Sequence, residues 1–339
     1  MKKISILVPC YNEEKNVVPL SEAIIAQFEE FLPNYRYEIV FIDNDSKDAT
    51  REKLTELCAL NKNIKAIFNA KNFGQFNSPY HGICQTDGDC TILMAADFQD
   101  PVEMIPKFVA EWEAGYKIVS AIKTKSKENP LVRFLRTCYY KAIKRMSDIE
   151  QIEHFTGFGL YDKSFVTVLR DLKDPTPFLR GIVAELGFKR KEIPYEQPKR
   201  RAGKTSNNWY RLYDAAMLSF TSYTKIGMRI ASIFGFFTSM ISIIIATVYL
   251  VLKIIFWDSF VLGNAPMLIG MFALGGIQLF FIGLLGEYIM SINTRVMNRP
   301  LVVEERRLNF DSSDNENTAI EKNQDSAAAE TRNENGDNT

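Results

Sequence analysis

Short apolar runs alternate with amphipathic stretches through the first two hundred residues. The apolar runs predict strands at Ile4–Val8, Tyr37–Ile42, Ile64–Phe68, Cys90–Ala95 and Lys117–Ile122. Helical spacing of apolar positions predicts helices near 13–30, 48–60, 76–86 and 101–114. Strands that alternate with helices are typical of a doubly wound, mostly parallel sheet. We therefore predict an α/β domain over residues 1–205.

The pattern changes near residue 229, where two long uncharged segments begin. The segment from Ile230 to Leu252 has 23 residues without a charge, and the segment from Ser259 to Gly286 has 28. At ~1.5 Å per residue, the first makes a helix roughly 34 Å long, enough to cross a ~30 Å hydrocarbon core. We therefore predict a two-helix transmembrane hairpin over residues 229–290, with helices at about 230–252 and 264–286.

Charges around the two uncharged segments predict their orientation. The linker Ile254–Ala265 contains Asp258 and no lysine or arginine. The outer flanks are basic and carry Lys225, Arg229, Arg295, Arg299, Arg306 and Arg307. Since basic flanks remain in the cytoplasm, we expect a multi-pass protein of the cytoplasmic membrane, with the α/β domain and both termini in the cytoplasm.

Three further segments complete the expected organisation. Residues 206–228 carry apolar side chains at helical spacing, which predicts a juxtamembrane helix that lies on the bilayer or packs against the α/β domain. Residues 291–310 are expected to be a cytoplasmic juxtamembrane segment. Residues 311–339 are polar and aperiodic, which predicts a disordered acidic tail.

Composition narrows the partners and the chemistry. Lys+Arg and Asp+Glu both total 41, but the acidic tail carries a net −6 and leaves +6 on residues 1–310. A basic body suits an anionic ligand or a membrane surface, and an ordinary solvated surface explains it equally well. Five cysteines without a C-x-x-C pair indicate reduced thiols, and two histidines argue against a histidine-rich zinc site.

Polar side chains follow several of the predicted strands. Ligands of open α/β sheets bind at the carboxyl ends of the strands, where these residues lie. Carboxylate and amide oxygens suit Mg²⁺ or Mn²⁺ bound together with a substrate's phosphates. Helix capping explains some of the same residues, and a capped strand-to-helix junction is the alternative for the acidic loop. The candidates are Pro9, Tyr11, Glu13, Asp43, Asp97, Gln99 and Asp100.

Six ordered segments together resemble a known enzyme family. They are VPCYNEEKN, FIDNDSKDAT, MAADFQDPVEMIP, FLRGIVAELGF, PYEQPKRRAGKTS and GEYIMSINTRVMNRP, and they span about residues 3–303. They resemble the polyprenyl-phosphate group of the family-2 glycosyltransferases, which includes dolichyl-phosphate mannose synthases and bactoprenol glucosyltransferases. The resemblance implies a Rossmann-like GT-A-type fold followed by the two-helix hairpin.

The resemblance also implies roles for individual residues. Pro9, Tyr11, Glu13 and Asp43 would hold the uridine part of a UDP-sugar donor. Asp97 and Gln99 would ligate an Mg²⁺ or Mn²⁺ ion that bridges the diphosphate, and Asp97, Asp100 and Arg200 would form the catalytic group. Lys123 and Arg133 would contact the acceptor's phosphate, and Lys204 would close over the donor with Arg200. A solvated surface is the alternative for Lys123, Arg133 and Lys204.

The implied reaction moves a hexose, with glucose favoured, from a UDP-sugar to undecaprenyl phosphate with inversion. A phosphate monoester has a second pKa near ~6, so it is mostly a dianion at neutral pH and needs no general base. The expected partners are the UDP-sugar, the polyprenyl phosphate and the membrane, and we expect no nucleic-acid partner. Small residues in the second uncharged segment permit helix packing within or between chains, so a homo-oligomer is left open.

Two positions depart from the family pattern and keep alternatives open. Ala95 replaces the first aspartate of the usual acidic pair, and Gly157 stands where many members have an aspartate. The acidic role would then fall on Asp100 or Glu185, or the protein would be a catalytically dead scaffold or a nucleotide-sugar-binding subunit. A processive polysaccharide synthase is the third hypothesis, but its usual Gln-x-x-Arg-Trp motif is absent because Arg201 follows Arg200.

Overall fold

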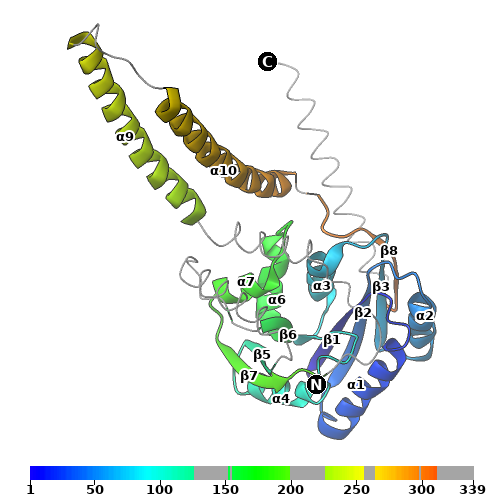
Figure 1. Cartoon of the computed structure of the whole chain (residues 1–339). Coiled ribbons are helices and arrows are strands. Elements are labelled where there is room, and N and C mark those ends of the chain that lie inside the picture. The colour runs from blue at the N-terminus through cyan, green and yellow to red at the C-terminus, as the bar shows by residue number, and fades with distance from the viewer. Residues whose placement is uncertain (126–151, 153–154, 199–225, 256–263, 298, 311–339) are drawn as a thin grey trace, which may run out of the picture.

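The centre of the α/β domain is one mixed sheet flanked by helices (Figure 1). The computed structural model describes residues 1–125, 152, 155–198, 226–255, 264–297 and 299–310. Within these residues the strand order is β7-β5-β6-β4-β1-β2-β3-β8. The strands are β1 (Lys3–Cys10), β2 (Arg36–Asp43), β3 (Ile64–Asn69), β4 (Cys90–Leu93), β5 (Ile118–Lys125), β6 (Phe155–Asp162), β7 (Arg190–Glu196) and β8 (Glu304–Leu308).

The central strands β3, β2, β1 and β4 pair in parallel. Successive residues of a strand point to opposite faces, and in β1 Ile6 enters one core while Leu7 enters the other. The first core contains residues of α1 (Val17–Phe31), α2 (Thr50–Leu60) and α4 (Met104–Glu113). The second contains residues of α3 (Gly74–Gln85), α6 (Lys163–Leu172) and α7 (Leu179–Glu185). The predicted doubly wound sheet is therefore confirmed, with five strands and four helices close to their expected positions.

The outer strands make the sheet mixed. β6 lies between β4 and β5 and is antiparallel to both, whereas β7 runs parallel to β5. A Cβ atom at Gly159 of β6 would lie 2.3 Å from the carbonyl oxygen of Val119, so only glycine permits this close approach of β6 to β5. The sequence pattern did not indicate β6, because its glycines interrupt the alternation of apolar and polar residues.

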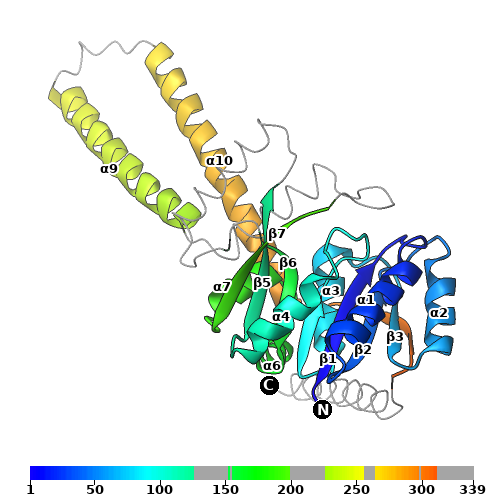
Figure 2. The same cartoon turned by 90° about the horizontal axis from the view of Figure 1, so that it is seen from below.

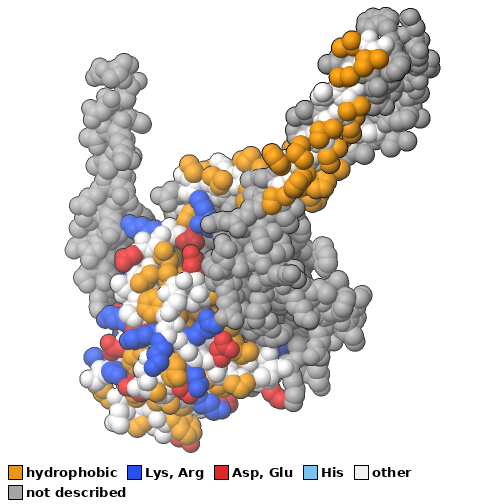
Figure 3. Space-filling model, turned by 90° about the vertical axis from the view of Figure 1, so that its left-hand side faces the viewer, with side chains coloured by type: hydrophobic (Ala, Val, Ile, Leu, Met, Phe, Trp, Pro, Cys, Tyr) orange, Lys and Arg blue, Asp and Glu red, His pale blue; other side chains and the backbone are white. Residues whose placement is uncertain are grey.

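Two long helices, α9 (Ile226–Ile255) and α10 (Asn264–Val296), project from the domain (Figures 1 and 2). Apolar side chains cover the side of this projection seen in Figure 3, and many of them are exposed. One stretch among the described residues, Leu274–Val296, is long and apolar enough to cross a membrane, with a mean hydropathy of 1.5. The two-helix transmembrane hairpin remains a prediction. Most of the predicted juxtamembrane helix and the whole acidic tail lie outside the described residues.

After α10 the chain returns to the sheet. β8 pairs antiparallel with β3 at the sheet edge, although the sequence analysis placed this segment outside the α/β domain. Glu304 of β8 forms ion pairs with His81 of α3 and with Arg307. Arg295, near the end of α10, pairs with Asp174 of the domain at 3.2 Å. The segment after α10 is thus bound to the domain at both ends.

Candidate active site

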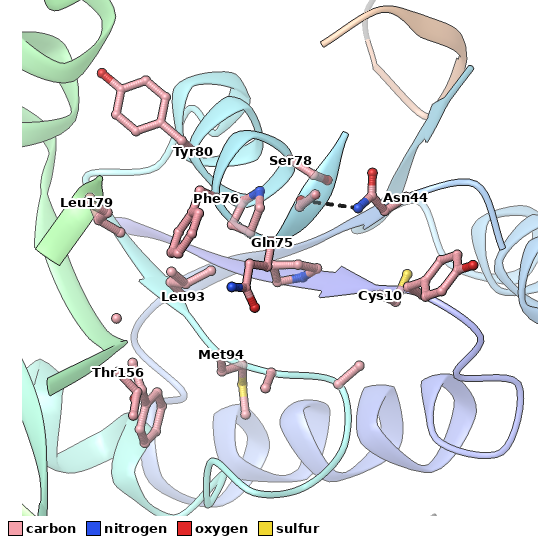
Figure 4. Close-up of a pocket in the computed structure, with 18 of the residues that line it drawn as sticks. Cys10, Asn44, Gln75, Phe76, Ser78, Tyr80, Leu93, Met94, Thr156 and Leu179 are labelled. Carbon is pink, nitrogen blue, oxygen red and sulfur yellow. Dashed lines mark hydrogen bonds between the residues drawn. The ribbon is translucent and has the colours of Figure 1, made fainter. Parts of the chain in front are cut away.

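A pocket of about 970 Å³ opens at the carboxyl ends of β1, β2 and β4. Figure 4 shows Cys10 and Asn44 at one end, with Leu93 and Leu179 at the other. The end at Cys10 and Asn44 is polar and is lined by residues 9–13, by residues 72–75 and by Asn44. The end at Leu93 and Leu179 is apolar and also carries Phe76, Tyr80 and Phe178. Residues 94–97, Asp100 and Phe158 complete the lining, so the pocket has polar and apolar parts.

The loops after β1 and β2 hold each other at the polar end. The backbone N–H of Asn12 donates to the Ser46 hydroxyl at 2.8 Å, and the N–H of Lys47 donates to Asn12 Oδ1 at 2.8 Å. Asn12 and Asp45 have positive φ angles, which Asn and Asp tolerate better than most residues. This arrangement places the predicted residues Pro9, Tyr11 and Glu13 in the pocket lining.

Asn44 connects the loop after β2 with the loop after β3. Its side-chain nitrogen donates to Asn72 Oδ1 at 3.0 Å and to the Gly74 carbonyl at 3.2 Å, and its side-chain oxygen accepts the N–H of Phe73 at 2.9 Å. Asn44 lines the pocket, but the sequence analysis did not select it. Its position directly after a predicted strand, beside Asp43 and Asp45, was the available signal.

Asp43 lies behind the pocket wall. Its side chain is fully buried and is not part of the pocket lining. The Arg51 Nε atom pairs with it at 2.8 Å, and the backbone N–H of Ser46 donates to both carboxylate oxygens at 3.2–3.3 Å. The structure therefore does not bring the Asp43 carboxylate to the pocket. Instead, this carboxylate holds the loop that carries Asn44.

The acidic loop after β4 brings two carboxylates to the pocket. Asp97 and Asp100 are both nearly buried and both line it. Asp97 accepts the N–H of Gln99 at 3.1 Å, and Asp100 accepts the N–H of Ala95 at 2.8 Å. Burial raises the pKa of Asp100 to about 7, and the negative charge of Asp97 contributes in the same direction.

The donor set fits a divalent cation that shares its ligands with a substrate. In the described part of the chain, no group of three or more His, Cys, Asp or Glu side chains is arranged to hold a metal by itself. Mg²⁺ usually binds one or two carboxylates and completes its shell with phosphates and water. Asp97 and Asp100, which repel each other across one pocket wall, meet that requirement. Gln99 is half-buried and is not part of the pocket lining, although it follows Asp97 in the same loop.

The remaining predicted residues lie outside the pocket lining or outside the described part of the chain. Lys123 lies on β5 opposite Tyr195, half-buried and outside the pocket lining. Arg133, Arg200 and Lys204 lie outside the described residues. Glu185, the alternative to Asp100 for the acidic role, is exposed at the end of α7 and is not part of the pocket lining.

Ala95 and Gly157, the two departures from the family pattern, both line the pocket. Gly157 has a φ of +102°, a conformation that residues with side chains rarely adopt.

Arg180 also lines the pocket, from the first turn of α7. Arg180 belongs to the family segment FLRGIVAELGF, which by itself indicates no role for this side chain.

Comparisons with known proteins place the chain in a family. The family model described as "Glycosyl transferase family 2" matches residues 5–169. The bactoprenol glucosyl transferase of Shigella phage SfX is 32% identical over 299 residues, which cover 88% of this chain and 97% of that protein. An uncharacterized glycosyltransferase of Synechocystis is 31% identical over 302 residues, covering 88% and 93%. A prophage bactoprenol glucosyl transferase homolog of Escherichia coli K12 is 30% identical over 305 residues, covering 90% and 99%.

These relatives match this chain along almost their whole length, through the α/β domain and the two projecting helices. Similarity of this extent is expected for proteins that share both a fold and a reaction type. The chain is a glycosyltransferase and belongs to glycosyl transferase family 2.

Proposed function

We propose that this glycosyltransferase transfers a hexose, with glucose favoured, from a UDP-sugar to undecaprenyl phosphate at the cytoplasmic face of the membrane. The observation that carries the proposal is one pocket that has a polar end, an apolar, aromatic end and the carboxylates of the loop after β4 in its lining. A nucleotide sugar suits the first end and a lipid phosphate suits the second. The near-complete match to proteins named bactoprenol glucosyl transferases supports the same substrates.

The reaction is a single displacement at the sugar's anomeric carbon. A phosphate oxygen of the lipid forms a bond to that carbon, and the bond from the carbon to the UDP oxygen breaks. UDP leaves with the electron pair, and the configuration at carbon inverts. Because the attacking phosphate is already mostly a dianion near pH 7, none of the pocket carboxylates has to remove a proton.

The chain's own residues position the donor. Tyr11, Glu13 and Asn44 surround the polar end, and we assign the UDP part of the donor to this end. Asp43 would act indirectly by holding the loop that carries Asn44. Asp97, with Gln99 and Asp100 on the same loop, would hold Mg²⁺ or Mn²⁺ against the diphosphate. When bound, that cation would supply charge stabilisation for the departing UDP.

The projecting helices support a membrane location. The ion pair between Arg295 and Asp174 joins the basic end of α10 to the α/β domain. Since basic flanks mark the cytoplasmic side, this contact is consistent with a cytoplasmic active site. A lipid acceptor could then reach the pocket without leaving the bilayer.

A lipid-transfer assay tests the proposal. The full chain in detergent is supplied with undecaprenyl phosphate, Mn²⁺ and a panel of radiolabelled UDP-sugars, and label that moves into organic-extractable lipid is counted. We expect transfer from one hexose donor and its loss when a chelator removes the cation. Full-rate transfer after chelation would overturn the metal dependence.

The same assay separates the competing functions. UDP binding without transfer from any donor would indicate a nucleotide-sugar-binding scaffold, the hypothesis raised by Ala95 and Gly157. Label in a growing polymer, rather than in a lipid with one sugar, would indicate a processive synthase.

A further inference from the structure

Arg180 differs in charge from the other ionisable groups that surround the pocket. The described lining residues include three acidic side chains, Glu13, Asp97 and Asp100, and the one basic side chain of Arg180. Arg180 comes from α7, whereas the carboxylates come from the loops after β1 and β4. The pocket therefore carries a positive charge on a wall separate from its carboxylates.

The surroundings of Arg180 are aromatic. The centre of its guanidinium lies 6.0 Å from the centroid of the Phe178 ring, and Phe178 packs edge-to-face on Phe76 at 5.7 Å. Phe178, Phe76 and Leu179 all line the pocket beside it. A cation that is half-buried against aromatic rings loses part of its hydration, which strengthens its attraction for an anion.

Aromatic hydroxyls near this end are already bonded within the protein. The Tyr80 hydroxyl donates to the carbonyl of Leu169 at 2.7 Å, and the Tyr161 hydroxyl donates to the carbonyl of Gly157 at 2.7 Å. Figure 4 shows the Tyr80 hydroxyl pointing away from the centre of the pocket. Tyr161 is fully buried behind the lining, and Tyr80 directs its hydroxyl into the protein. The rings of Phe76 and Phe178 have no hydroxyl, so this part of the lining suits a hydrocarbon ligand.

Arg180 and Asp100 act on the same buried hydroxyl. Burial raises the pKa of Tyr161, the charge of Arg180 opposes that increase and the charge of Asp100 adds to it. Arg180 and Asp100, which both line the pocket, therefore lie close enough to Tyr161 for their charges to act on the same hydroxyl.

We propose that Arg180 binds the phosphate of the lipid acceptor, and that Phe76, Phe178 and Leu179 hold the first isoprene units. The inference rests on the proposed function and deepens it. A guanidinium makes paired hydrogen bonds to phosphate oxygens, and the adjacent rings continue as an apolar surface. An anionic head joined to a hydrocarbon chain matches this order of groups, whereas a nucleotide diphosphate does not.

The charge balance of the reaction supports the same assignment. The attacking phosphate and the donor's diphosphate are both anions and repel each other as they approach. The carboxylates of the acidic loop add to that repulsion unless a cation covers them. The guanidinium of Arg180, which comes from α7, offsets the acceptor's charge, so the two substrates can bind together.

Kinetics of R180Q and R180K in the full chain test the assignment. Undecaprenyl phosphate and the shorter farnesyl phosphate serve as acceptors. We expect R180Q to raise the KM for both acceptors about 10- to 100-fold, the usual effect of losing a charged hydrogen bond. R180K keeps the charge but loses the paired geometry, so it should restore part of the loss. UDP affinity in the presence of Mn²⁺ should stay within about twofold in both variants.

R190Q is the matched control. Arg190 lies on β7, is half-buried, pairs with Glu192 at 3.4 Å and is outside the pocket lining. Its substitution should leave both KM values unchanged. Unchanged acceptor KM in R180Q would overturn the inference, and so would a weaker affinity for UDP, which would make Arg180 a donor residue.

Equilibrium binding of farnesyl phosphate separates this inference from the proposed function. Wild type should bind it, inorganic phosphate should compete only weakly, and R180Q should bind it at least tenfold more weakly. Equal binding by wild type and R180Q would reject the role of Arg180 even if transfer occurs. Binding that depends on Arg180 without any sugar transfer would reject the proposed reaction and leave the phosphate site intact.

Discussion

The two halves of the sheet contribute different things to the pocket. The parallel half, β3-β2-β1-β4, ends in loops whose polar side chains hydrogen-bond to neighbouring backbone, so Asn12, Asn44 and Asp97 have defined positions. The mixed half, β6-β5-β7 with α7, contributes glycine, aromatic side chains and Arg180. Because β4 and β6 are antiparallel, the end of β4 lies beside the start of β6, and the two sets meet there. The parallel half therefore carries most of the polar residues predicted from sequence, and the mixed half shapes the rest of the cavity.

Substitution of Asp97 should have the largest effect on activity. D97N removes the carboxylate charge that a divalent cation requires, and we expect sugar transfer to fall about 10³-fold, equivalent to ~4 kcal/mol of transition-state stabilisation. Transfer to lipid is measured alongside the melting temperature, which should change little. E103Q, at an exposed position just after the same loop, serves as the control and should keep full activity. If D97N keeps more than a tenth of wild-type activity, the parallel half does not supply the essential carboxylate.

Removal of Arg51 should have the next largest effect, on stability. R51M leaves the fully buried Asp43 carboxylate without its cation, and breaking a buried pair from one side costs about 3 kcal/mol. For a domain of this size we expect the melting temperature to fall by roughly 6–12 °C. R36M changes an exposed arginine on β2 and should alter it by no more than ~1 °C. An unchanged melting temperature in R51M would show that Asp43 does not depend on this pair.

Glu304 should make the attachment of β8 depend on pH. Burial alone would raise the pKa of Glu304, but hydrogen bonds from His81 and Arg307 outweigh it and hold that pKa at about 2. A lowered carboxylate pKa stabilises the fold above the unfolded-state value of about 4.5, and this contribution is lost as the pH falls toward 2. At pH 7 we expect E304Q to be ~2 kcal/mol less stable than wild type.

Unfolding measured from pH 7 to pH 2.5 checks this expectation. The stability difference between wild type and E304Q should shrink below about pH 4.5 and fall to roughly a quarter of its pH 7 value at the acidic end. E56Q, which changes an exposed glutamate on α2, should show no such convergence. A difference that is constant over the whole range would mean that the charge of Glu304 is not what holds β8.

An aspartate at position 157 should have the smallest effect. G157D places a side chain on a backbone with φ +102°, which costs about 1–2 kcal/mol of stability. A Cβ atom there would meet Leu93 at an ordinary 3.7 Å, so strain rather than a clash is the cause. The control G115D has a similar φ of +94° and open space around it, and should lose a similar amount. Higher transfer activity in G157D would show that an acidic side chain in the mixed half can assist sugar transfer.

The central strands and their helices were predictable from sequence, because burial on both faces of a parallel sheet leaves local apolar runs. The acidic loop after β4 was predictable for a related reason, since polar residues that interrupt a buried strand mark its carboxyl end. Pro9, Tyr11, Glu13, Asp97 and Asp100 all line the pocket, and their roles there stay predictions. The strands and loops that carry them depend on neighbours in the chain, so they can be read from local sequence.

The tertiary structure alone decided which residues complete the site. Asp43 and Asn44 are adjacent, yet Arg51 pairs with the buried Asp43, whereas contacts with the loop after β3 hold Asn44 in the pocket lining. β6 and β8 pair with strands distant in sequence, so their pairing leaves no local signature. Arg180 likewise lines the same pocket as the carboxylates only because α7 packs against the sheet beside β6. Such contacts depend on long-range pairing and on the side to which a residue points, and neither is encoded in the local alternation of apolar and polar positions.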